Sequence, residues 1–167
     1  MKLLKMTKKD FKGQEYYDLL DYIFKEADTF EFTIAEENVK VNFKNILNKN
    51  RLEDAYSKYL DPLDEFLIEK KKTHRNLVKI FEERYKIHVF KYKAINRSKE
   101  VIKTFTNHAY GWDICMGLEY LTFYSGESEL VSIVEDEDEI YFFNASLDTI
   151  FPKIKEHTDD WNMWEDE

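Results

Sequence analysis

Residues 118–144 read LEYLTFYSGESELVSIVEDEDEIYFFN, and this stretch decides the fold class. Three runs in it are rich in apolar, aromatic and β-branched residues, as strands are. These runs are Leu118–Tyr124, Leu130–Val134 and Ile140–Asn144. Two short polar connections, Ser125–Glu129 and Glu135–Glu139, separate them, and Gly126 in the first connection can adopt the positive φ of a tight turn. The stretch therefore predicts an antiparallel β-meander in the last third of the chain.

The preceding residues carry mostly helical patterns. In Gln14–Ala27, apolar residues recur at every third or fourth position, which predicts a helix. The same spacing in Arg51–Leu60 and Leu63–Lys71 predicts two helices that meet at a kink at Asp61-Pro62, with Asp61 as the N-cap of the second. The remaining expected elements are a helix over His74–Tyr85, a strand over Ile87–Ile95, a short helix capped by Ser98, and a last short helix that begins at Ser146 and ends before Pro152.

Phe30–Phe43 fits two structures. Its apolar residues alternate in two runs around the polar stretch Ala35–Asn38, as in a β-hairpin. Thr33 and Glu36 also have the spacing of a helix capping box, so a helix over the second half is the alternative. The high content of β-branched and aromatic residues favours the hairpin.

Together these patterns predict a single α+β domain over residues 1–167. N-terminal helices are expected to pack on a mostly antiparallel sheet that ends in the meander and the short final helix. A chain of 167 residues is of ordinary size for one domain. The single cysteine, Cys115, cannot form an internal disulfide, and no apolar run is long enough to span a membrane, so we expect a cytoplasmic location.

Charge is distributed unevenly along the chain. Residues 106–167 have a net charge of −14, residues 1–105 a net charge of +5, and the whole chain −9. The first part is therefore helix-rich and mildly basic, and the second part β-rich and strongly acidic. Such a field steers oppositely charged partners, so the sequence predicts an acidic face that docks a basic protein.

Seven residues are the candidates for that contact. Five are the consecutive carboxylates of the second meander connection, and two are tail tryptophans, the residue type most typical of interface anchors. The candidates are Glu135, Asp136, Glu137, Asp138, Glu139, Trp161 and Trp164. The alternatives are that the carboxylates form an exposed solubilising turn and that the tryptophans close the core or lie in a frayed tail.

A second candidate surface is basic. Residues 70–105 have a net charge of +9, and clustered cations are what phosphate binding needs. The residues that would bind nucleic acid are Lys70, Lys71, Lys72, Arg75, Lys91 and Lys93. Lysine outnumbers arginine in this stretch, which disfavours readout of bases. The alternative is a solvated lysine-rich face.

The sequence contains no established catalytic motif. Four glycines leave no glycine-rich phosphate loop, and the four histidines lack zinc-ligand spacing, so no cofactor, metal site or catalytic residue is expected. A metal-dependent enzyme that uses Asp136 and Asp138 is the remaining catalytic alternative.

The function predicted from these features is a non-enzymatic binding protein. Small acidic inhibitors that block basic toxins, such as bacterial immunity proteins and antitoxins, are the physical model for it. Residues 140–154, expected as strand, turn, strand and helix, are loosely similar to the end of a family of bacterial immunity domains. That resemblance implies a toxin domain as the basic partner and assigns no site residue. The uneven charge would also permit head-to-tail association of the basic and acidic parts.

Overall fold

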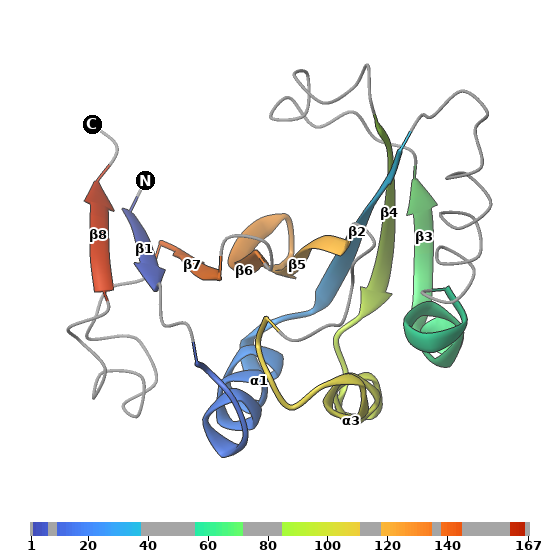
Figure 1. Ribbon diagram of the computed structural model, residues 1–167, viewed down its shortest axis with the longest axis horizontal. Helices are drawn as coiled ribbons and strands as arrows, with labels where there is room; N and C mark the ends of the chain where they lie inside the picture. The colour runs from blue at the N-terminus through green and yellow to red at the C-terminus, as the bar shows by residue number, and fades with distance from the viewer. Residues whose placement is uncertain are drawn as a thin grey trace.

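The computed structural model describes residues 2–6, 10–37, 56–71, 85–110, 118–134, 138–144 and 161–165. In these ranges the backbone alone is described at residues 2, 35–37, 85–87, 118–120 and 161–165. The described chain is α+β, with helices gathered along one face of an eight-stranded sheet (Figure 1). No helix in these ranges is both long and apolar enough to cross a membrane.

The elements follow one another as β1 (Lys2–Met6), α1 (Gln14–Glu26), β2 (Thr29–Glu37), the π-helical turn η1 (Tyr56–Leu60), the 3₁₀ helix η2 (Asp61–Phe66), β3 (Leu67–Lys71), β4 (Tyr85–Lys93), α3 (Asn96–Phe105), β5 (Leu118–Ser125), β6 (Ser128–Val134), β7 (Glu139–Phe143) and β8 (Trp161–Glu165). The strand order is β3-β4-β2-β5-β6-β7-β1-β8. Every pair of neighbours is antiparallel. The N-terminal strand β1 therefore lies between two strands of the acidic part.

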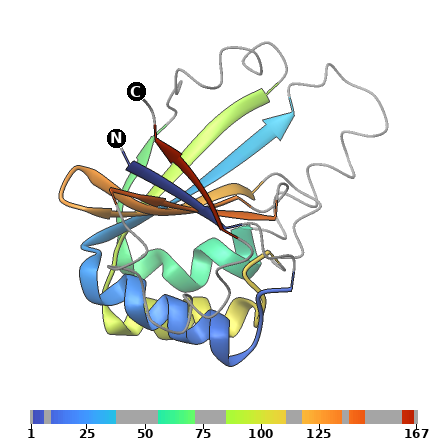
Figure 2. The same ribbon diagram turned by 90° about the vertical axis from the view of Figure 1, so that its left-hand side faces the viewer.

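The core lies between the sheet and the helices. Viewed from the side, α1, α3 and the helical turns all lie below the sheet (Figure 2). Phe30 of β2 is fully buried, and its ring stacks on that of Tyr92 with centroids 5.2 Å apart. Phe123 of β5 lies on the other side of Phe30, with centroids 5.8 Å apart. Because strand residues alternate between faces, every second residue of the central strands joins this aromatic layer.

Salt bridges join the helices α1 and α3. Lys99 and Lys103 of α3 both place their ammonium groups on the carboxylate of Asp21 in α1, with N–O distances of 2.6 Å and 2.7 Å. The Asp21 side chain is partly exposed, whereas Leu20 and Ile23 of the same helix are buried. The ion pairs therefore fix how the helices sit against one another, while the apolar residues supply the burial.

Several expectations from the sequence are confirmed. The helix predicted at Gln14–Ala27 is α1, and the strand predicted at Ile87–Ile95 is β4. The strand-like runs of residues 118–144 are β5, β6 and β7, which pair in succession. Gly126 has a φ of 58°, as the first turn requires.

The prediction for residues 63–71 is wrong in part. Residues 56–66 are helical, but the helix ends at Phe66, and Leu67–Lys71 is the strand β3 rather than a continuation of the helix. Asp61 is not the N-cap: Leu60 occupies that position, and Asp61 lies in the first turn beside Pro62. Pairing with β4 decides the outcome, because a five-residue segment gains a ladder of hydrogen bonds there that its helical spacing could not reveal.

Two other local assignments need correction. The strand β2 continues to Glu37, so the turn predicted at Ala35–Asn38 does not begin at Ala35, and the helical alternative is wrong over residues 35–37. Ser98 is the third residue of α3 and not its cap. Its hydroxyl accepts a hydrogen bond from the Ile95 backbone N–H at 3.0 Å and donates to the Lys93 carbonyl at 2.7 Å. Ser98 thus stabilises the start of the helix from inside its first turn.

Some predicted elements lie outside the described residues. They are the second half of the Phe30–Phe43 segment, the start of the Arg51–Leu60 helix, residues 74–84 of the next helix, and the final helix after Ser146. The strands β1 and β8 were not predicted from the sequence. In β1 the order Lys-Leu-Leu-Lys-Met does not alternate cleanly, although Leu4 and Met6 are fully buried.

Candidate protein-docking site

The acidic connection between β6 and β7 leads into a paired carboxylate. Glu139 is the first residue of β7, and its carboxylate forms an ion pair with the Lys5 ammonium of β1 and accepts a hydrogen bond from the Tyr141 hydroxyl. Because β1 is the direct neighbour of β7, Lys5 faces Tyr141 across the strands. These two contacts hold Glu139 in place at the end of the acidic connection. The Lys5 ammonium also neutralises the charge of the Glu139 carboxylate.

Asp138, the residue before this anchor, has an uncommon backbone conformation. Its φ is 53°, in the left-handed region that Asp tolerates better than most residues, and its side chain is half-buried. Burial, and secondarily the negative charges of Asp138 and Glu139, raise the pKa of the buried Tyr110 phenol. Glu135, Asp136 and Glu137 lie outside the described residues.

The two tail tryptophans belong to β8. In the pairing of β8 with β1, Trp161 is opposite Met6 and Trp164 is opposite Leu3. Met6 is in turn opposite Ile140 of β7, so Trp161 lies in the row next to Glu139. The backbone of both tryptophans is thus part of an ordered strand and not a frayed tail, while their side chains are outside the description.

The sheet order brings two acidic stretches together. Since β7 and β8 are both antiparallel to β1, they run in the same direction and begin at the same end of the sheet. We name this place, marked by Asp138, Glu139 and Trp161, the acidic end. The Glu135–Glu139 connection leads into it from β6, and in the sequence Asp159 and Asp160 directly precede β8. Separation in the sequence had hidden this proximity.

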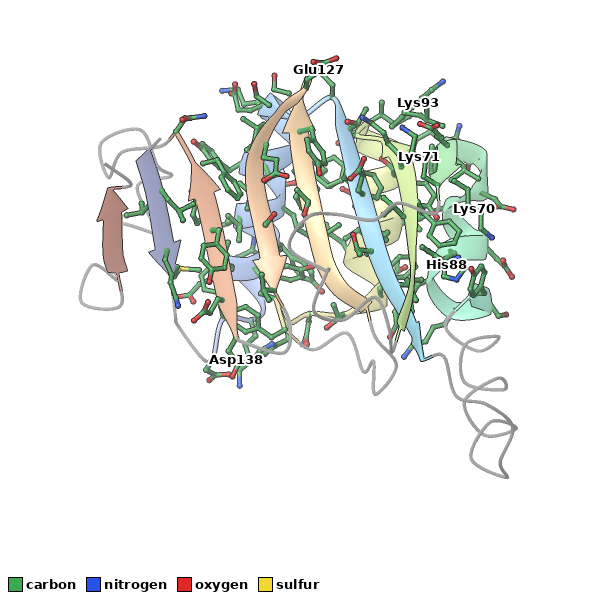
Figure 3. The ribbon with its side chains drawn as sticks, turned by 90° about the horizontal axis from the view of Figure 1, so that it is seen from above. Lys70, Lys71, His88, Lys93, Glu127 and Asp138 are labelled. Atoms are coloured by element: carbon green, nitrogen blue, oxygen red, sulfur yellow. The ribbon has the colours of Figure 1, made fainter. Side chains whose placement is uncertain are left out.

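The basic candidates lie on the strands at the opposite side of the sheet. Figure 3 shows Lys70, Lys71 and Lys93 over β3 and β4, away from Asp138 at the end of β7. Lys70 and Lys71 are exposed on β3, Lys93 is exposed on β4, and Lys91 of β4 is half-buried. We name this group the basic edge. Lys72 and Arg75 lie outside the described residues.

Most cations of the basic edge already have partners within the protein. The Lys70 ammonium lies 4.8 Å from the centre of the Phe90 ring, and the Lys91 ammonium lies 5.4 Å from that of Tyr124. Lys71 contacts the Glu69 carboxylate at 2.6 Å, a hydrogen bond that raises the pKa of Lys71. These lysines are therefore only partly available to an external anion.

Opposite charges face one another across the sheet. Within the basic part of the chain, Glu69 of β3 is opposite Lys91 of β4, and Lys91 is opposite Glu31 of β2. At the other side, β1 places Lys5 beside β7, and the ion pair of Lys5 with Glu139 joins the basic part of the chain to the acidic part. The charge of Glu139 is therefore offset by a lysine from the first part of the chain.

Other polar groups near the acidic end show no catalytic arrangement. The His108 Nδ1 atom accepts a hydrogen bond from the Tyr110 backbone N–H at 3.0 Å, and its Nε2 atom lies 3.7 Å from the Asp10 carboxylate. Over the described ranges, no cluster of three or more His, Cys, Asp or Glu side chains is arranged to hold a metal ion. Cys115 and Asp136 are outside those ranges.

Comparison with protein-family models, with curated proteins and with solved structures finds no match for this chain. Lys5, Tyr110 and Tyr141 were missed as members of the acidic end. No signal in the sequence could have found Lys5, because its role depends on the insertion of β1 beside β7.

Proposed function

We propose that this protein is a binding protein that docks a basic protein partner through its acidic end. The observation that carries the proposal is the parallel course of β7 and β8 on the two sides of β1. This course directs the Glu135–Glu139 connection and the start of β8 to one place. Carboxylates gathered at one end of a molecule attract a basic partner and orient it during the encounter.

The anchoring of Glu139 supports the proposal. Lys5 and Tyr141 contact the Glu139 carboxylate and so hold the residue at which the acidic connection enters β7. Asp138, in a left-handed conformation, directly precedes Glu139. Trp161 begins β8 one row away and is of the residue type that most often anchors interfaces. The acidic end thus combines carboxylates, which speed the encounter with a basic partner, with an aromatic residue suited to anchor it.

Nucleic-acid binding at the basic edge is less well supported. Lys71 is paired with Glu69, and Lys70 and Lys91 lie over aromatic rings. Glu31 and Glu69 flank Lys91 in the strand register, where they would repel phosphates. A negative net charge on the whole chain adds to this repulsion.

The test neutralises the acidic connection and leaves its anchor intact. The docking variant carries Glu135→Gln, Asp136→Asn, Glu137→Gln and Asp138→Asn, and retains Glu139. A matched control variant removes the same charge from exposed positions elsewhere, namely Glu26, Asp64, Glu100 and Glu127. The probe is a short lysine- and arginine-rich peptide, titrated into isotopically labelled protein and followed by amide chemical shifts.

We expect the peptide to shift amide signals of β1, β7 and β8 near Met6, Glu139 and Trp161. At low salt, the docking variant should bind at least about tenfold more weakly than the wild type, mainly through slower association, and the control variant should be close to wild type. Equal weakening in both variants would show that only net charge matters. Signals that shift elsewhere, or no binding, would overturn the proposal.

The same pair of variants then tests the natural partner. A protein captured by the wild type should be basic, and its association rate should fall with the docking variant and not with the control. If a captured partner binds the docking variant at the wild-type rate, the acidic connection acts only in solubility.

A further inference from the structure

The terminal strand β3 is unusually exposed. All five of its residues are exposed, including the apolar Leu67 at 37% and Ile68 at 47%. Over the described residues β3 pairs only with β4, and it is the last strand on its side of the sheet. The side chains on both faces of β3 are more exposed than those of the central strands. An exposed terminal strand is a template for pairing with another strand.

Two features of β3 restrict which strands can pair with it. Lys70 and Lys71 are exposed on it, and the register shifts between Leu67 and Glu69, which makes Ile68 a bulged residue. Lysines and bulges at a sheet edge discourage pairing with neutral or basic strands. The two lysines would attract an acidic strand rather than repel it. The β3 edge therefore favours acidic strands over neutral or basic ones.

The strand at the other side of the sheet has the complementary chemistry. In the described chain, β8 is the last strand next to β1, with the sequence WNMWE, and Asp159 and Asp160 precede it. It thus combines apolar residues with acids, whereas β3, with the sequence LIEKK, combines apolar residues with lysines.

The number of strands determines how two such edges can meet. Eight strands with only antiparallel neighbours leave β3 and β8 pointing in opposite directions. If a second copy continues the sheet with its helices on the same face, β8 of one copy is antiparallel to β3 of the next. The alternation of strand directions then continues without interruption.

One antiparallel alignment places residues of matching chemistry opposite one another. Around the bulged Ile68 it pairs Leu67 with Trp164, Glu69 with Asn162 and Lys70 with Trp161. These are an apolar pair, a hydrogen-bonding pair and a cation–π pair, and such cross-strand pairs stabilise sheets. In the sequence, the acidic Asp160 directly precedes Trp161 and has the charge opposite to that of Lys71.

We infer that the exposed edge of β3 is a docking surface for the β8 strand of a second copy of this chain. The interface is heterologous, since each copy offers β3 on one side and β8 on the other. With a twist of about 20–25° between neighbouring strands, eight strands rotate each successive copy by roughly 180°. The assembly therefore does not close into a small ring but grows as a series of oligomers. Trp161 and the two acids before it belong to both surfaces, but this inference does not require the basic partner proposed for the acidic end.

Sedimentation velocity tests the inference. At ~0.15 M salt, where repulsion between whole molecules is largely screened, the mean mass of the wild type should rise steadily with concentration and pass that of a dimer. Lys70→Glu with Lys71→Glu blocks the β3 edge, and Asp159→Lys with Asp160→Lys blocks the β8 edge. Each blocked variant alone should remain monomeric. The control, Lys12→Glu with Lys25→Glu, makes the same charge change as the β3-blocked variant at exposed positions outside β3 and β8, and it should associate as the wild type does.

Mixing the two blocked variants is the decisive step. One variant retains an intact β8 and the other an intact β3, and the reversed charges at the two blocked edges complement each other, so an equimolar mixture should regain the association that each variant alone has lost. A wild type that stays monomeric, a mixture that stays monomeric, or a control that loses association would each overturn the inference. Circular dichroism checks that the variants fold.

A measurement on the wild type alone serves if a blocked variant does not fold. The exchange of the β3 amide hydrogens should slow as the protein concentration rises, because a docked strand would cover them. Exchange that is independent of concentration would refute docking at β3. The docking variant at residues 135–138 should self-associate normally, which separates this surface from the acidic end.

Discussion

A pair of buried hydroxyls in the middle of the sheet allows a quantitative test of the structure. Thr122 of β5 and Ser132 of β6 are opposite one another, and their hydroxyl oxygens are 2.8 Å apart. Thr122 is 1% exposed and Ser132 is 7% exposed, so the two hydroxyls form a hydrogen bond with each other in place of one with water. Thr122→Val keeps the side-chain shape and leaves the Ser132 hydroxyl buried without its partner, which should cost about 1–3 kcal/mol. Ser132→Ala should cost a similar amount for the converse reason.

The double variant distinguishes the hydrogen bond from simple burial. With both hydroxyls removed, no polar group is left unsatisfied, so the double variant should be within about 1 kcal/mol of the wild type. The coupling free energy between the two sites should therefore be at least about 1 kcal/mol. Urea unfolding of the four proteins measures it, with shifts of the midpoint at an unchanged m-value. Additivity within about 0.5 kcal/mol would refute the pairing of these hydroxyls.

Three more variants test the helix pair and the β5–β6 turn. Partial burial raises the pKa of Asp21, but hydrogen bonds from Lys103 and Lys99 outweigh it and lower that pKa below the ordinary 3.8. Asp21→Asn should therefore lower the free energy of unfolding by about 0.5 kcal/mol at neutral pH. The effect is small because solvent screens this partly exposed ion pair. The difference in stability between the variant and the wild type should be fully present above pH 3.8 and should disappear as the pH falls through the lowered pKa of Asp21. A stability difference that grows in acid would contradict the ion pairs. Gly126→Ala should cost about 1–2 kcal/mol from its positive φ alone, since no atom lies within 4 Å of the added Cβ, and Gly126→Asn should cost less. Thermal unfolding that shows no difference between these last two variants would contradict the turn.

The candidate site was only partly visible in the sequence. Five consecutive carboxylates and two tail tryptophans stand out in any chain, because their chemistry does not depend on the fold. Their mutual placement does depend on it. Glu139 looked like one acid among five, and it is instead paired with Lys5, more than 130 positions earlier in the chain. Contacts between residues so distant in sequence leave no local pattern.

The sequence by itself determined the α1 helix, the strand β4 and the strands of residues 118–144. Each has a hydrophobic period or a turn residue that only one local structure satisfies. It also determined the net charge of each part of the chain. Only the tertiary structure decided that Leu67–Lys71 is a strand, that β1 lies between β7 and β8, and that β3 and β8 end the described sheet. Short segments have little local preference, and hydrogen bonds to a neighbouring strand outweigh it.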